Sequence, residues 1–223
     1  VSTVRESIGN QRFSVGPRTR IPVLARKDTA LSWRSYFELL RLPAVFTVVA
    51  DVMMGYLITR GDLTPWPAFA LYLGGACCLY LAGMVLNDVY DLELDAHERP
   101  ERPLPSGRIS LATATTIGLG LMAAGVALIG AASALVGTWV IGFIGVLLAS
   151  AVWTYTRTHR HVATAAIMMA SCRSMNVIMA MGVAAYSLAP AGVPPGTESE
   201  RAISAGAWLY IAGVTWFSRS ESR

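Results

Sequence analysis

Apolar residues occupy six long runs along the chain, separated by short polar segments. Each run approaches the length of about 20 residues that an α-helix needs to cross the hydrocarbon core of a bilayer. The runs cover approximately residues 42–59, 66–87, 111–130, 134–153, 163–188 and 203–217. Short connections make successive helices antiparallel neighbours. The pattern predicts an all-α fold, a polytopic membrane bundle of six transmembrane helices.

Composition supports a membrane protein and excludes an ordinary cytosolic enzyme. Only 14% of the 223 residues are charged, 54% are hydrophobic and the mean hydropathy is +0.49, whereas about 25% of a soluble domain is charged. No Asp or Glu occurs between Arg102 and Thr197. Cys77, Cys78 and Cys172 lie in apolar runs without the spacing of metal ligands, which indicates small buried hydrophobic residues.

The basic residues predict the orientation of the bundle. With the N-terminus inside, the segments on that side hold fifteen Lys or Arg residues and the opposite loops hold only Arg60 and Arg201. Basic residues flanking membrane spans stay in the cytoplasm. We therefore expect a basic cytosolic segment over residues 1–34 and an acid-rich cytoplasmic loop over 88–108. Because the basic residues follow topology without forming a patch, no nucleic-acid partner is expected.

The second run ends in an acidic motif, N-D-V-Y-D-L-E-L-D, which begins at Asn87. On a helix, Asp88, Asp91 and Asp95 fall within about 60° of arc, and Asn87 lies one turn from Asp91. Three like charges on one face repel each other unless a cation lies between them. Carboxylates together with substrate phosphate oxygens are the usual Mg²⁺ environment. We interpret the stripe as a Mg²⁺-diphosphate site; a solvated helix end is the alternative.

The loop after this motif reads E-R-P-L-P-S-G-R and carries Arg102 and Arg108. Guanidinium groups suit phosphate oxygens through bidentate hydrogen bonds, although anchoring at the membrane surface also explains the two arginines.

Two charged residues fall inside predicted spans, Asp51 and Arg173. Each costs about 2.5 to 3.5 kcal/mol at the bilayer centre, so we expect them to pair or to line a cavity, which Arg173 and Asn176, one turn apart, would help to shape.

The motif from Asn87 to Asp95, followed by Arg102-Pro103-Leu104-Pro105-Ser106-Gly107, resembles the first aspartate-rich motif of the UbiA superfamily of membrane prenyltransferases. Tyr155 to His161 resembles the cytoplasmic segment after that family's fourth helix. Weaker similarity covers Arg41-Leu42-Pro43 and Arg173 to Asn176. The resemblance extends over a UbiA-like domain at residues 35–223.

The resemblance implies transfer of a prenyl group from a polyprenyl diphosphate to a lipophilic acceptor, aromatic or tetrapyrrole in type, with Mg²⁺ as cofactor and release of diphosphate. It implies an integral membrane protein, expected in a bacterial inner membrane with its active-site loops in the cytoplasm. The implied metal ligands are Asp88, Asp91 and Asp95. The implied catalytic set adds Asn87, Arg102, Tyr155 and Arg160, and the implied substrate-binding residues are Arg41, Arg173 and Asn176.

Family members have nine helices and a second aspartate-rich motif after the sixth. The sequence has six runs and no D-x-x-x-D after Asp95, so we expect a C-terminally incomplete domain. Two alternatives follow. One is a catalytically incomplete membrane scaffold or transporter-like protein. The other is a CDP-alcohol phosphotransferase, whose D-G-x-x-A-R pattern is not found at Asp88 or Asp91.

Overall fold

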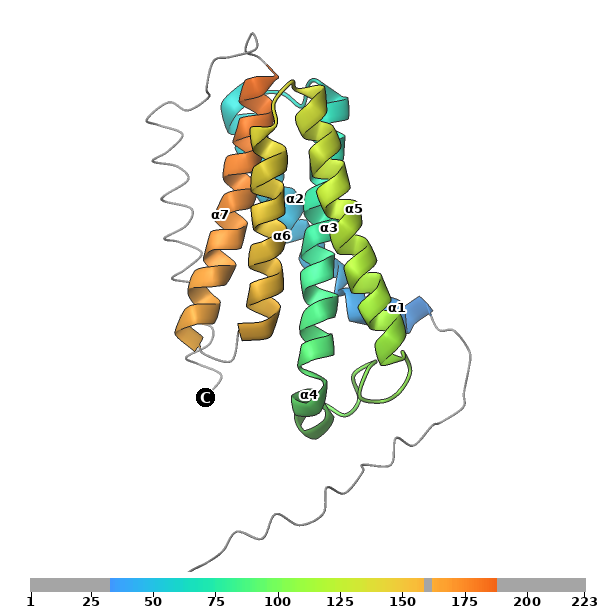
Figure 1. Cartoon of the computed structure of the whole chain (residues 1–223). Coiled ribbons are helices and arrows are strands. Elements are labelled where there is room, and N and C mark those ends of the chain that lie inside the picture. Colours follow the sequence, from blue (N-terminus) through green and yellow to red (C-terminus); the bar gives the residue numbers. More distant parts are fainter. Residues whose placement is uncertain (1–32, 159–161, 188–223) are drawn as a thin grey trace, which may run out of the picture.

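Helices account for all the regular secondary structure of residues 33–158 and 162–187, the part of the chain that the computed structural model describes. Figure 1 shows them as an upright bundle with a short helix, α4, at one end. In chain order they are α1 (Trp33–Leu40), the 3-10 turn η1 (Leu42–Ala44), α2 (Val45–Arg60), α3 (Trp66–Tyr90), α4 (Leu92–Glu98), α5 (Leu111–Leu135), α6 (Val140–Thr158) and α7 (Val162–Tyr186).

Five helical segments of the described chain are long and apolar enough to cross a membrane, and the first of them joins α1, η1 and α2. They confirm the first five predicted spans with shifted ends. The first segment begins at Trp33 rather than at residue 42. The ends next to the α5–α6 turn also shift, because α5 continues to Leu135 and a turn containing Gly137, at a φ of 72°, precedes α6. The sixth predicted span, 203–217, lies outside the described residues.

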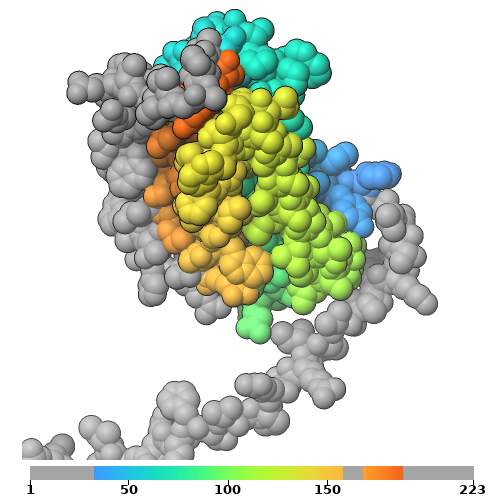
Figure 2. All heavy atoms as spheres, turned by 45° about the horizontal axis from the view of Figure 1, so that its top comes forward, coloured from blue at the N-terminus to red at the C-terminus, as the bar shows by residue number. Residues whose placement is uncertain are grey.

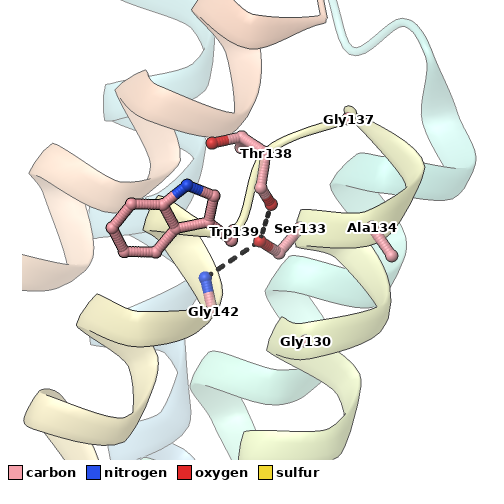
Figure 3. A pocket seen from close by; sticks show the side chains of 7 residues that line it. All are labelled: Gly130, Ser133, Ala134, Gly137, Thr138, Trp139 and Gly142. Carbon is pink, nitrogen blue, oxygen red and sulfur yellow. Dashed lines mark hydrogen bonds between the residues drawn. The ribbon is translucent and has the colours of Figure 1, made fainter.

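Ser133 holds the turn between α5 and α6 together. Its hydroxyl donates to the carbonyl oxygen of Thr138 and accepts a hydrogen bond from the backbone N–H of Gly142 at 3.0 Å. These contacts line an open surface pocket at the turn (Figure 3). A buried serine hydroxyl therefore satisfies backbone groups that the turn leaves without helical partners.

Glycines let two pairs of helices approach closely. A Cβ atom added at Gly75 of α3 would lie 2.6 Å from the Ile129 side chain of α5, and one at Gly55 of α2 would lie 2.5 Å from the Val177 carbonyl oxygen of α7. Close approach through small residues is how membrane helices associate. The pairs α3–α5 and α2–α7 consequently make the two most extensive helix contacts. The α6 helix lies between α5 and α7, as Figure 2 shows on one face.

Large apolar side chains cover the outside of the bundle. Trp33 at the start of α1, Trp66 at the start of α3 and Trp139 just before α6 are 75%, 71% and 76% exposed. A surface of this kind suits lipid rather than water, and tryptophan is enriched where a membrane meets water. Trp66 and Trp139 flank connections at one end of the bundle and Trp33 lies toward the other, so the tryptophans mark both edges of the apolar belt.

Candidate active site

The acidic motif spans the junction between α3 and α4. The α3 helix ends at Tyr90, and Asp91, with φ and ψ of −90° and 4°, joins it to α4. Helical hydrogen bonds continue on both sides of the junction, from the N–H of Asp91 to Asn87 and from the N–H of Asp95 to Asp91. The motif is therefore nearly helical throughout, as its spacing predicts, but the contacts of its side chains divide it into two sets.

Asp88 and Asp95 form the first set, which is buried and bound by arginines. Arg41 donates from Nη2 to Oδ1 of Asp88 at 2.6 Å, and Arg102 donates from Nη1 to Oδ2 of Asp95 at 2.5 Å. The same Nη1 lies 3.5 Å from Oδ1 of Asp88. Both carboxylates are only 5% exposed. Two cations thus offset two buried carboxylates, which would otherwise be costly to bury.

Asn87 and Asp91 form the second set and face a cavity. Nδ2 of Asn87 donates to Oδ2 of Asp91 at 3.0 Å, and both residues line the cavity. Carboxylate and carboxamide oxygens are the hard donors that Mg²⁺ prefers, with substrate phosphate oxygens completing its shell. The donor set of this second pair fits the Mg²⁺ expected from the sequence.

No three His, Cys, Asp or Glu side chains of the described chain come close enough together to hold one metal ion. Asp88, Asp91 and Asp95, predicted to share Mg²⁺, are divided here because Arg41 and Arg102 bind two of them. Their joint role as metal ligands stays a prediction.

The cavity measures 410 Å³ and lies among α2, α3, α6 and α7. Six residues predicted for the site line it together, although they come from distant parts of the sequence: Arg41, Asn87, Asp91, Tyr155, Arg173 and Asn176. The rest of the wall is mainly apolar, from Leu79, Met84, Leu148, Val152 and Met169 among others. A polar end and an apolar body are the features expected of a site for an amphiphilic ligand.

The two charges predicted inside the membrane spans pair with each other. Arg173 donates from Nε and Nη2 to Asp51 at 2.9 and 2.8 Å, a bidentate contact across α2 and α7. Arg173 also lines the cavity, whereas Asp51 lies behind it. Both predicted roles of Arg173, pairing with Asp51 and lining the cavity, are therefore found together.

The loop after α4 positions Arg102 and directs Arg108 away from the cavity. The hydroxyl of Ser106 donates to the carbonyl oxygen of Arg102 at 2.6 Å, which folds the loop back on itself. Arg108 binds Glu38 of α1 at 2.6 Å and the carbonyl oxygen of Glu101 at 2.6 Å. Arg108 therefore ties the loop to α1. Arg160, the remaining predicted site residue, lies outside the described residues.

Sequence reasoning missed Thr47, Tyr80, Gly83 and Cys172, which also line the cavity. A signal for two of them exists on α3. Tyr80 and Gly83 precede Asn87 by seven and four residues, and this spacing places them on the same helix face. The helix face that carries Asn87 therefore continues toward the start of α3 through Gly83 and Tyr80. Extending the spacing of the acidic motif to earlier positions would have predicted this side of the cavity.

The fold and the cavity define an integral membrane helical bundle with a polar site opening into an apolar interior. A model of the UbiA prenyltransferase family matches residues 48–220. The chain belongs to the UbiA prenyltransferase family, and this match sets aside the CDP-alcohol phosphotransferase alternative.

Curated relatives match part of the chain. Digeranylgeranylglyceryl phosphate synthase of Sulfolobus acidocaldarius is 40% identical over 98 residues, which cover 43% of this chain and 34% of the relative. The proteins of the same name from Sulfurisphaera tokodaii and Methanoculleus marisnigri are 33% identical over 98 residues and 43% identical over 76. These cover 44% and 34% of this chain and 35% and 26% of the relatives. The matched part is about a third of each relative's length or less.

A solved structure supports the fold. It is reported with structural and mechanistic insights into the biosynthesis of digeranylgeranylglyceryl phosphate synthase in membranes, and it aligns with a TM-score of 0.66 at 23% identity. The alignment covers 81% of this chain and 60% of the other. The relatives named above come from archaea, so the bacterial inner membrane expected from the sequence stays a prediction.

Proposed function

We propose that this protein transfers a prenyl group from a polyprenyl diphosphate to a lipid acceptor that carries a glyceryl phosphate. The observation that carries the proposal is the meeting of Asn87, Asp91 and Arg41 at one wall of a largely apolar cavity between membrane helices. A diphosphate needs the polar wall and a prenyl chain needs the apolar one. The cavity offers both within a single space.

In the proposed reaction the acceptor oxygen forms a bond to the first carbon of the prenyl chain. The bond from that carbon to the diphosphate oxygen breaks, its electron pair leaves with diphosphate, and the acceptor proton passes to diphosphate or water. Negative charge grows on the departing oxygens, so preorganised positive groups aimed at them lower the barrier most. Mg²⁺, held by Asp91 and Asn87, would neutralise part of that charge.

The chain's own residues would bind and orient the donor. Arg41 reaches the cavity while bound to Asp88, and this contact fixes its guanidinium at the polar wall. Tyr155 of α6 faces the same space and would donate a hydrogen bond to a diphosphate oxygen. Arg102, held by Asp95, adds positive charge behind the acidic set. The apolar wall, which includes Leu148 and Val152, would exclude water from the reacting carbon.

The names of the relatives favour the acceptor class. Those relatives are synthases of digeranylgeranylglyceryl phosphate, a product with two prenyl groups on one glyceryl phosphate. The acceptor that precedes such a product carries one prenyl group and a free hydroxyl. We therefore prefer this lipid to the aromatic or tetrapyrrole acceptors expected from the sequence alone, and an assay with both classes separates them.

The test measures product formation and donor binding by the full chain in membranes. Radiolabelled geranylgeranyl diphosphate and Mg²⁺ are supplied with geranylgeranylglyceryl phosphate in one arm and 4-hydroxybenzoate in the other. Asp91→Asn should lower kcat/KM by about 100-fold or more, the size seen when one group that stabilises transition-state charge is removed. Glu93→Gln, on exposed α4 surface, should stay within about twofold of the parent, since Glu93 does not line the cavity.

A second readout separates the enzyme from a scaffold. Binding of the unreactive thiolo analogue of geranylgeranyl diphosphate should require Mg²⁺ and should weaken in Asp91→Asn. A parent chain that binds no analogue at any Mg²⁺ concentration would overturn the proposal and favour the scaffold or transporter-like alternative. Product only with 4-hydroxybenzoate would retain the prenyltransferase and reject the lipid acceptor.

A further inference from the structure

A second polar group of residues lies within the membrane part of the cavity, apart from the acidic motif. Its centre is the bidentate pair of Arg173 and Asp51, which joins α7 to α2. The Asp51 side chain is 7% exposed, whereas that of Arg173 is 30% exposed and lines the cavity. Asp51 therefore holds the guanidinium of Arg173 in place, and of these two residues only Arg173 is positioned to contact a ligand in the cavity.

Asn176 adds a carboxamide to this surface one helical turn from Arg173. It is 7% exposed, lines the same cavity, and its Oδ1 has no hydrogen-bond partner in the described part of the chain. Its backbone is fixed, because the hydroxyl of the fully buried Tyr72 donates to its carbonyl oxygen at 2.8 Å. A buried polar atom without a partner costs about 1 to 3 kcal/mol, so a bound partner would recover that free energy.

The surroundings make a purely hydrocarbon ligand a poor fit for this part of the cavity. Leu79, Leu148 and Met169 supply an apolar wall that a prenyl chain could fill. A prenyl chain, however, has no group that can form a hydrogen bond with a guanidinium or a carboxamide. Ionisable groups inside a membrane are expensive and commonly mark the path of a polar ligand.

We infer that Arg173, supported by Asp51, and Asn176 bind the hydroxyl-bearing glycerol portion of the acceptor. This inference rests on the proposed function and names the part of the acceptor that the protein recognises. Asp51 balances the charge of Arg173, so the pair suits a neutral hydrogen-bonding group better than a second phosphate dianion. A hydroxyl both donates and accepts, and the carboxamide of Asn176 turns about its Cβ–Cγ bond to present either atom.

This assignment divides the cavity between the two substrates. The diphosphate of the donor is bound by Arg41, Asn87 and Asp91. The glycerol portion of the acceptor is bound by Arg173 and Asn176. Asp51 is then a positioning residue, since it acts only through Arg173. The alternative is that the Asp51–Arg173 pair merely holds α2 against α7.

A binding experiment with matched ligands tests the hydroxyl. Affinities of the full chain are measured for geranylgeranylglyceryl phosphate and for the analogue in which hydrogen replaces its free hydroxyl. Asn176→Leu should weaken binding of the hydroxyl compound by about tenfold and change binding of the analogue by less than about twofold. Ser174→Ala is the matched control, because Ser174 is also buried with an unpartnered Oγ on α7 but does not line the cavity.

The inference is wrong if Asn176→Leu lowers the affinity for the two ligands equally, or if it lowers neither affinity. It stands apart from the proposed function, because Mg²⁺-dependent binding of the thiolo diphosphate is measured on the same samples. Normal binding of that donor analogue with no hydroxyl effect overturns only the inference. If the parent chain does not bind the donor analogue at any Mg²⁺ concentration, the proposed function is overturned.

An exchange of charges separates a recognition role for Arg173 from a structural one. The double variant Asp51→Arg with Arg173→Asp keeps an ion pair between α2 and α7 but removes the guanidinium from its position on the cavity wall. We expect it to recover the thermal stability lost in Arg173→Ala, while KM for the acceptor stays at least about tenfold above that of the parent and KM for the donor is unchanged. If the double variant recovered both the acceptor KM and the thermal stability of the parent, the pair would serve only to hold α2 against α7, and the inference would be wrong.

Discussion

Arg41 shows how one side chain connects the polar wall of the cavity to the packing of the bundle. It adopts a left-handed conformation with φ and ψ both 47°, which is unusual for a residue other than glycine. This conformation turns the chain between α1 and η1 and lets the guanidinium reach Asp88 on α3, forty-seven positions later. Backbone strain of this kind commonly occurs at functional sites, and here it accompanies a residue of the cavity wall.

Asp62 illustrates a residue whose charge matters for stability. Its carboxylate accepts hydrogen bonds from the hydroxyl and the backbone N–H of Thr64 at 2.7 and 2.9 Å and from Nε of Arg60 at 2.9 Å. These bonds, chiefly those from Thr64, lower the pKa of Asp62 below its ordinary value. The folded protein thus favours the ionised form and stabilises the short connection between α2 and α3.

The lowered pKa of Asp62 predicts a pH dependence of stability. The stabilising contribution is present above the unfolded pKa of about 4 and is lost as the pH falls through the lower folded pKa. Asp62→Ala should therefore lower the thermal midpoint in detergent at pH 7, and the difference from the parent should shrink below about pH 4. A difference that does not change between pH 7 and pH 3 would contradict this explanation.

At the scale of the helix, sequence patterns predicted much of the site. The spacing of the motif indicated Asn87 and Asp91, the charge inside a predicted span and its helical neighbour indicated Arg173 and Asn176, and the family resemblance added Tyr155. The structure places all five around one cavity. Spacing alone could not reveal that Asp88 and Asp95 pair with arginines. Those contacts depend on how the α1–η1 junction and the loop after α4 fold back, which are long-range features.

Helix spans were likewise predictable, because bilayer thickness fixes their length. Their ends were less so. The α5 helix exceeds its predicted end by five residues, and the turn after it depends on the Ser133 hydroxyl and on Gly137. Such capping contacts leave little trace in a hydropathy pattern. The cavity itself was not predictable in detail, since its apolar lining residues look like any other packing residues.

Close packing of α2 on α7 gives a prediction at the scale of the helix pair. A methyl group added by Gly55→Ala would lie 2.5 Å from the Val177 carbonyl oxygen and 3.0 Å from the Ala180 Cβ atom. The helices must separate to admit it, at a cost of about 1 to 3 kcal/mol. We expect a lower thermal midpoint in detergent and a weaker Asp51–Arg173 contact.

Gly120→Ala is the control for that substitution. Gly120 lies on α5 with nothing within 4 Å of the added Cβ atom. Alanine has the higher helix propensity, so this variant should be as stable as the parent or slightly more stable. Equal destabilisation by the two substitutions would argue against close α2–α7 packing as the cause.

The whole molecule places its two kinds of connection at opposite ends. The acidic loop and the α1 end of the bundle lie together, and the α2–α3 and α5–α6 turns lie at the other end. The excess of Lys and Arg on the acidic side predicts that this end faces the cytoplasm. The orientation decides which compartment would supply the diphosphate donor of the proposed reaction.

Thiol labelling of intact cells tests the orientation. Trp139→Cys, at a position 76% exposed before α6, should react with a membrane-impermeant maleimide added outside. Glu101→Cys, in the exposed acidic loop, should react only after the cells are opened. The parent chain, whose three cysteines are partly buried in helices, provides the background. The reverse pattern would place the acidic loop outside.

The exposed tryptophans have a consequence for how substrates arrive. Trp33 toward one end and Trp66 and Trp139 at the other hold the bundle at a set height in the bilayer. The lipid acceptor proposed above would diffuse in the plane of that bilayer, with its own head group held at the surface. Under the proposed function, the enzyme and its acceptor would therefore meet by diffusion in two dimensions. The effective acceptor concentration would be its mole fraction among the surrounding lipids.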